Sequence, residues 1–118
     1  MKQLKRYQEK AIKQLVTASK MYFDTDENET IVFQAPTGSG KTFMLTNYIS
    51  EIIRDSQLNL CFLWVSIGTG NLHFQSYKSV KNNISSLIDC SLLENEFFGK
   101  RKSIRKNEVV FLNWEKIR

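Results

Sequence analysis

Proline, histidine and cysteine are all scarce in this chain. Pro36 is the one proline, His73 is the one histidine, and the two cysteines are Cys61 and Cys90. The cysteines do not form a Cys-x-x-Cys pair, and no histidine lies close to either in sequence. Because a zinc site needs clustered thiolate and imidazole ligands, we expect none. The two thiols are interpreted as buried or incidental groups in a reducing compartment.

Long apolar runs are missing as well. None approaches the roughly 20 residues that cross a bilayer, and the start Met-Lys-Gln-Leu-Lys-Arg lacks the apolar core of a signal peptide. We therefore expect a cytoplasmic protein without a membrane partner. An apolar share of 42% and a charged share of 25% are ordinary for a globular protein, and the 118 residues suffice for one small domain.

Positive charge is in moderate excess. The net charge is +5, and many of the basic residues fall within residues 2–13 and 100–106. The excess fits a polyanionic partner, although a solvated surface explains it equally well.

The hydrophobic pattern alternates between helical and strand periodicity. It predicts helices over about residues 3 to 21 or 23, 41–55 and 71–87, and strands over residues 30–35, 59–66 and 108–113. The nearly continuous apolar run of the second strand indicates burial on both faces, as in a parallel sheet. Residues 91–107 show no clear pattern. This order predicts a three-layer α/β fold with a parallel sheet and right-handed crossovers.

A glycine-rich turn between a strand and a helix is the most informative stretch. Gly38 and Gly40 allow backbone angles that turn successive amides inward, so that the N–H groups of about residues 37–42 can converge on phosphate oxygens at a helix N-terminus. Lys41 adds a mobile charge for the outer phosphates, and the Thr42 hydroxyl is suited to Mg²⁺. The expected ATP-binding and catalytic residues of this loop are Pro36, Thr37, Gly38, Ser39, Gly40, Lys41 and Thr42.

The loop departs from the general G-x-x-x-x-G-K-[ST] pattern at Ala35, where glycine is usual. Ala-Pro-Thr-Gly-Ser-Gly-Lys-Thr nonetheless closely resembles the Walker A motif of superfamily 2 helicases and translocases, in which alanine is common at that place. The alternative is a simple Gly/Ser turn without a ligand.

Two further stretches extend the resemblance. Leu4 to Ile12 is similar to the Leu-Arg-x-Tyr-Gln-x-x-Ala-Ile segment ahead of Walker A, especially in the motor (Res) subunits of type III restriction enzymes; Lys5 stands where arginine is usual. The resemblance implies that Gln8 contacts adenine, with Tyr7 covering the base. The alternative for Gln8 is a solvated helix position.

Residues 62–75 resemble motif Ia of the same enzymes, with Gly68-Thr69-Gly70-Asn71 in place of the usual Pro-Thr. By position, Thr69 and Asn71 are the candidates for contact with nucleic-acid phosphates. Residues 109–117 resemble the strand and turn before Walker B. Trp64 and Trp114 are interpreted as core residues in preference to base-stacking platforms, and His73 as an ordinary helix residue.

The resemblance implies an ATP-driven DNA translocase or helicase, most like the restriction subunit of a type III restriction-modification system, with ATP and Mg²⁺ as cofactors. Residues 1–118 would be the N-terminal part of its first RecA-like domain. The partners that the resemblance implies are DNA, a second RecA-like domain with its arginine finger, and a methyltransferase (Mod) subunit. Because the Asp-Glu-x-x motif and the arginine finger are missing from these residues, we expect the chain alone to be inactive. The alternative function is a P-loop protein of another class, such as a small-molecule kinase or a regulatory NTPase.

Overall fold

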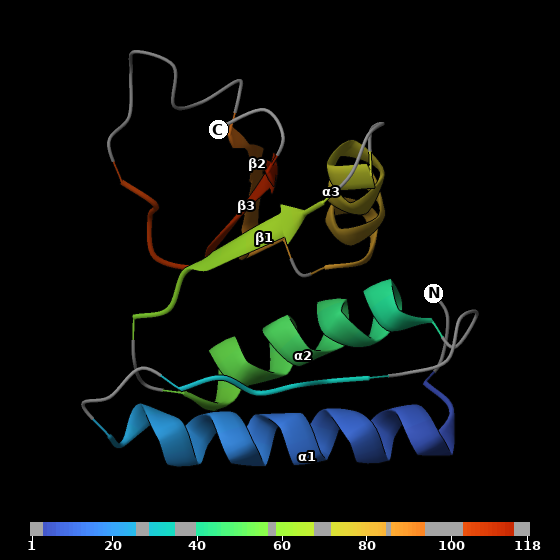
Figure 1. Ribbon diagram of the computed structural model, residues 1–118, viewed down its shortest axis with the longest axis vertical. Helices are drawn as coiled ribbons and strands as arrows, with labels where there is room; N and C mark the ends of the chain where they lie inside the picture. The colour runs from blue at the N-terminus through green and yellow to red at the C-terminus, as the bar shows by residue number, and fades with distance from the viewer. Residues whose placement is uncertain are drawn as a thin grey trace. The chain divides into compact units, whose positions relative to one another are not determined.

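A computed structural model describes residues 4–25, 29–34, 40–56, 59–67, 72–84, 86–93 and 103–114. The chain forms two compact units, residues 1–57 and 58–118, which Figure 1 shows in blue to green and in green to red. In the described part of the chain, no helix is long and apolar enough to span a membrane.

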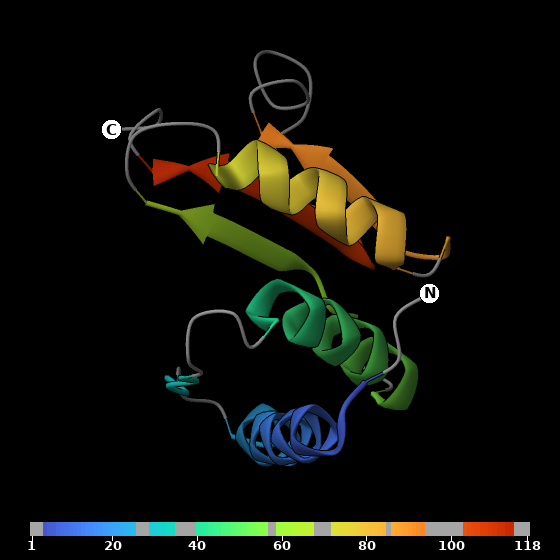
Figure 2. The same ribbon diagram turned by 90° about the vertical axis from the view of Figure 1, so that its right-hand side faces the viewer.

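Two helices make up most of the first unit. The helix α1 spans Arg6–Phe23 and α2 spans Lys41–Asp55, and both lie where the apolar spacing predicts them. They pack against each other side by side (Figure 2). The apolar residues buried in this unit are Ile12, Val16, Met44, Ile49 and Ile52. The Ser19 and Tyr48 hydroxyls form a 2.6 Å hydrogen bond between the helices.

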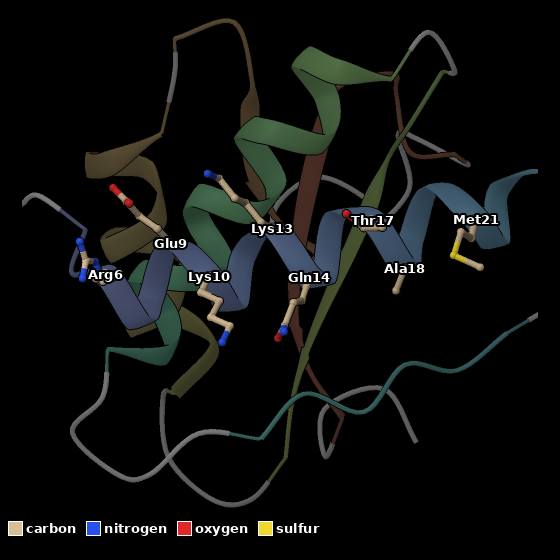
Figure 3. A pocket seen from close by; sticks show the side chains of 8 residues that line it. All are labelled: Arg6, Glu9, Lys10, Lys13, Gln14, Thr17, Ala18 and Met21. Carbon is tan, nitrogen blue, oxygen red and sulfur yellow. The ribbon is translucent and has the colours of Figure 1, made fainter.

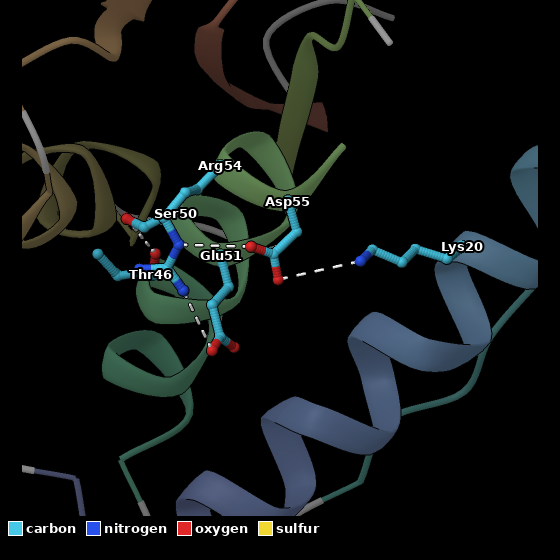
Figure 4. A network of polar contacts seen from close by, with 6 residues as sticks. All are labelled: Lys20, Thr46, Ser50, Glu51, Arg54 and Asp55. Carbon is cyan, nitrogen blue, oxygen red and sulfur yellow. Dashed lines mark hydrogen bonds and ion pairs between the residues drawn. The ribbon is translucent and has the colours of Figure 1, made fainter. Parts of the chain in front are cut away.

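Polar contacts on α2 accompany this packing (Figure 4). The Ser50 hydroxyl donates to the Thr46 carbonyl at 3.1 Å, and the Arg54 guanidinium lies 3.5 Å from Glu51 and 3.4 Å from Asp55. Lys20 of α1 approaches Asp55 at 4.0 Å. Because these ion pairs are exposed, each contributes only about 0 to 1 kcal/mol. The apolar contacts, and not the ion pairs, hold the two helices together.

The strand predicted over residues 30–35 is wrong for its described part. Residues 29–34 form neither helix nor strand, and Val32 is 77% exposed. A β-branched, apolar run favours a strand only when a neighbouring strand completes its hydrogen bonds, and no described residue pairs with this segment. Ala35 lies outside the described residues.

A parallel sheet organises the second unit. Its strands are β1 (Phe62–Ser66), β2 (Asp89–Leu92) and β3 (Glu108–Asn113), in the order β1-β3-β2, with both pairings parallel. All six residues of the central strand β3 are buried. The helix α3, Leu72–Asn83, packs on this sheet, where the ring of Tyr77 meets Phe111 edge-on at 5.7 Å. The parallel α/β fold expected from the sequence is confirmed.

A buried carboxylate fixes the start of β3. Glu108 is fully buried; it accepts hydrogen bonds from the Ser91 hydroxyl at 2.7 Å and from the Arg105 amide at 2.9 Å. Before it, Asn107 adopts a left-handed conformation with φ +58°. The Asn107 amide donates to Leu60 at 2.7 Å, and its carbonyl accepts from Asp89 at 3.0 Å. These bonds align the starts of the three strands.

Several details differ from the sequence predictions. β1 is not buried on both faces: Leu63 and Val65, which share one face of the strand, are exposed, whereas the residues of the opposite face are half-buried. α3 ends at Asn83 and not at residue 87: the Asn83 side chain donates to the Ser79 carbonyl at 2.7 Å and so satisfies a backbone group of the last turn. β2 was not predicted, because Asp-Cys-Ser-Leu has neither alternation nor strand-forming side chains.

Candidate functional site

The N-terminus of α2 is built to receive an anion. Its N-cap residue, Gly40, has φ +81° and ψ 40°, a left-handed conformation that side chains other than hydrogen rarely allow. The Gly40 carbonyl accepts from the Met44 amide at 2.9 Å, which starts the helix. No side chain among the described residues caps this end, and the first turn carries no acidic residue. The first amides and the positive end of the helix dipole can therefore act on a ligand.

Lys41 and Thr42 are the first two residues of α2. Lys41 is exposed, and Thr42 is half-buried. The Thr42 carbonyl accepts from the Thr46 hydroxyl at 2.7 Å, a bond that fixes the first turn. The other predicted residues of the loop, Ala35, Pro36, Thr37, Gly38 and Ser39, lie outside the described residues.

Gln8, far away in sequence, lies against this helix end. Its side-chain oxygen accepts from the Lys5 amide at 2.9 Å and so caps α1. A Cβ placed on Gly40 would stand only 2.9 Å from the Gln8 side-chain nitrogen. Gln8 is 6% exposed, so the alternative of a solvated side chain is wrong. The structure thus brings the Gln8 carboxamide to the residue that precedes Lys41.

Tyr7 stands beside Gln8 on the first turn of α1 and is 51% exposed. Half of its surface is therefore accessible to a partner. The sequence offers no signal for the contact between Gln8 and Gly40, because 31 residues separate the two positions. The backbone angles of Gly40 alone already explain why glycine stands at position 40.

The described residues fit a nucleotide with its magnesium ion. A helix N-terminus that no described side chain caps, with the cation of Lys41 beside it, suits phosphate. No group of three or more His, Cys, Asp or Glu in the described ranges could hold a metal by itself, but Mg²⁺ in nucleotide sites takes few protein ligands besides phosphates and water. The Thr42 hydroxyl is the described group that would join them.

The candidates for nucleic-acid contact are only partly described. Thr69 and Asn71 lie outside the described residues, and α3 begins directly after them at Leu72. His73 lies in the first turn of α3 and is fully buried. Trp64 is half-buried against Phe111 at 5.3 Å. The core placement predicted for Trp114 is wrong: it is 49% exposed, because β3 ends at the preceding residue.

The thiols also differ from each other. Cys61 is exposed, so of its two interpretations, a buried or an incidental thiol, only the second fits. Cys90 of β2 is partly buried, and burial raises the pKa of its thiol to about 11 in spite of the opposing effect of Lys81. Its thiolate fraction near neutral pH is therefore very small.

Comparison with known proteins agrees with this geometry. The profile of the family described as "Type III restriction enzyme, res subunit" matches residues 1–118. No curated protein and no solved structure matches the chain. The N-cap glycine of α2 meets a buried glutamine, the second unit holds a parallel α/β sheet, and the family profile covers the whole length. The chain therefore belongs to the family of type III restriction enzyme res subunits, which carry a helicase-like, RecA-like P-loop domain for ATP.

Proposed function

We propose that this chain is the N-terminal part of the first RecA-like domain of an ATP-driven DNA translocase, the restriction (Res) subunit of a type III restriction-modification system. The observation that carries the ATP-binding role is the position of Gln8 against Gly40. The family match supports the link to DNA restriction. A cytoplasmic location, with access to both ATP and DNA, is part of the same proposal.

In this function the loop before α2 holds the triphosphate. The N–H groups of residues 37–42 donate to its oxygens, with Pro36 stiffening the entry to the loop. Lys41 neutralises charge at the outer phosphates, and the Thr42 hydroxyl helps to hold Mg²⁺. When bound, the ion neutralises phosphate charge. The chain's own contribution is to bind and orient the nucleotide, while an arginine from a second RecA-like domain would complete the catalytic site.

Gln8 gives the site its preference for adenine. A carboxamide accepts from the exocyclic amine of adenine and donates to its N7, whereas guanine presents a carbonyl in place of that amine. The Gln8 oxygen accepts from Lys5, and a carbonyl oxygen has two lone pairs, so capping α1 leaves room for a base. Tyr7, half-exposed on the same turn, would cover the ring.

The test is the ratio of ATP to GTP affinity. A carbonyl facing a carbonyl costs about 1 to 3 kcal/mol, so the native chain should prefer ATP by roughly tenfold to a hundredfold. Gln8→Ala should abolish the preference. Gln14→Ala, which removes an exposed glutamine from the same helix, is the matched control and should keep it. Equal affinities in the native chain, or a preference that survives in Gln8→Ala, would show that Gln8 does not contact the base.

DNA is proposed to touch this chain through Thr69 and Asn71, by way of phosphates and not base edges. Such binding is insensitive to base sequence and falls steeply with salt. The second RecA-like domain and a methyltransferase (Mod) subunit are the proposed protein partners. A titration of the native chain with two duplexes of unrelated sequence tests the DNA contact, since a clear preference for one of them would contradict it.

A further inference from the structure

The outward face of α1 carries three cations that nucleotide binding does not use. Arg6, Lys10 and Lys13 are all exposed and recur at intervals of four and three residues, which places them on one side of a helix. The buried residues of α1 lie on the opposite side: Gln8, Ile12, Val16 and Ser19. With a rise of about 1.5 Å per residue, the three charges extend over about 10 Å.

A shallow depression of about 600 Å³ follows this face. Eight residues of α1 line it: Arg6, Glu9, Lys10, Lys13, Gln14, Thr17, Ala18 and Met21. Figure 3 shows Lys10 and Gln14 on one flank of the helix and Lys13 on the other. Glu9 is the acidic residue among these eight described residues, and Gln14 and Thr17 are polar.

Carboxylates lie near this face, but among the described residues its cations form no ion pair with them: Glu9 is part of the same lining, and Glu51 of α2 lines a smaller pocket beside Lys13. The ion pairs between described residues of the first unit involve Lys20 and Arg54. None of them includes a cation of this face. Glu9 offsets one of the three positive charges of the face, and the remaining excess of exposed cations attracts a polyanion.

We propose that this face of α1 binds the phosphodiester backbone of nucleic acid, as a second contact surface besides Thr69 and Asn71. That DNA is the physiological partner rests on the proposed function, whereas the shape and charge of the face are independent of that function. A strand with about one phosphate per 3.4 Å offers several charges along the 10 Å of the face, which a single phosphate ion does not. Guanidinium and ammonium groups contact phosphates without selecting bases.

The composition of the face argues against a membrane. A helix that lies on a bilayer presents a broad apolar side, whereas Met21 and Ala18 are the apolar residues among the eight. The guanidinium and ammonium groups at the ends of the long side chains of this face suit a phosphate backbone.

The experiment compares two triple variants of the whole chain. Arg6→Gln, Lys10→Gln and Lys13→Gln remove the cations of the face; Arg54→Gln, Lys78→Gln and Lys106→Gln remove the same net charge elsewhere. Affinity for a duplex DNA is measured over a range of salt concentrations. Because each phosphate contact contributes about 0.9 to the slope of log K against log salt, the first variant should lose about 2 to 3 from that slope. The control variant should stay close to the native chain.

Several outcomes would overturn the proposal: an unchanged slope in the α1 variant, equal losses in both variants, or no DNA binding by the native chain. Binding to anionic phospholipid vesicles that depends on the same three cations would assign the face to a membrane instead. A parallel titration with duplex RNA separates DNA from RNA as the source of the backbone. The ATP to GTP ratio of the α1 variant is measured beside it: a native ratio with an unchanged salt slope overturns only this inference, whereas a native chain without ATP preference contradicts the proposed function.

Discussion

Replacing Gly40 by alanine should destabilise the first unit and displace the Gln8 side chain from the N-terminus of α2. The left-handed backbone of Gly40, φ +81°, costs a residue with a Cβ about 1 to 2 kcal/mol. The new methyl group would also stand 2.9 Å from the Gln8 side-chain nitrogen, closer than nonbonded carbon and nitrogen tolerate. Because Gln8 is buried and bonded to the Lys5 amide, its carboxamide cannot move without weakening that cap.

Weakening the hydrogen bond between Gln8 and the Lys5 amide costs about 0.5 to 1.5 kcal/mol, the net value of one hydrogen bond. Gly40→Ala should therefore lower the free energy of unfolding by about 1.5 to 3.5 kcal/mol, as the sum of both costs. In a chain that already carries Gln8→Ala, the methyl group meets no carboxamide. There the same substitution should cost only the backbone part, about 1 to 2 kcal/mol.

Urea unfolding of the native chain, both single variants and the double variant measures this coupling as a double-mutant cycle. We expect a coupling of about 0.5 to 1.5 kcal/mol, equal to the hydrogen-bond part. ATP and GTP affinities of Gly40→Ala provide a second measurement, since a displaced Gln8 should also lose its preference for adenine. Strictly additive free energies together with an intact ATP preference would refute the reasoning, because they would mean that Gln8 and Gly40 do not touch.

Four further predictions concern the loop and the second unit. Lys41→Ala should weaken ATP binding measured by calorimetry, because a charge-assisted contact to phosphate is lost, whereas Lys20→Ala should not; equal affinities for all three proteins would contradict this. The chain alone should hydrolyse ATP at background rate, since an arginine finger is worth about a thousandfold or more; a robust rate that disappears in Lys41→Ala would show that the catalytic groups are already present. Ser91→Ala should lower the free energy of unfolding by about 1 to 3 kcal/mol, as it removes a donor from a buried carboxylate, and an unchanged urea midpoint would count against it. Iodoacetamide near pH 8 should alkylate Cys61 before Cys90, whose rate should keep rising with pH towards its pKa of about 11; mass spectrometry that finds Cys90 modified first would contradict the burial of that thiol.

Local sequence determined the helices of this protein and the central strand. The apolar spacing at three and four residues fixes α1 and α2, because each helix satisfies its own hydrogen bonds and needs only one partner for its apolar face. The run Val109 to Leu112 predicted β3 correctly, since consecutive apolar residues favour a strand that is covered on both faces. Gly40 is similarly local, because a residue in the left-handed conformation is specified by its own lack of a side chain.

Only the tertiary structure decided where the sheet ends and what stands beside the loop. Residues 30–34 and β1 have equally strand-like compositions, but pairing depends on distant residues: β1 finds β3, and residues 30–34 pair with no described strand. The weakly strand-like β2 forms because Asn107 and Glu108 supply its partners. The contact between Gln8 and Gly40 likewise depends on the packing of residues that are far apart in sequence. A hydrogen bond or a contact between residues far apart in sequence carries no local pattern, so packing alone brings the helix-capping Gln8 against Gly40.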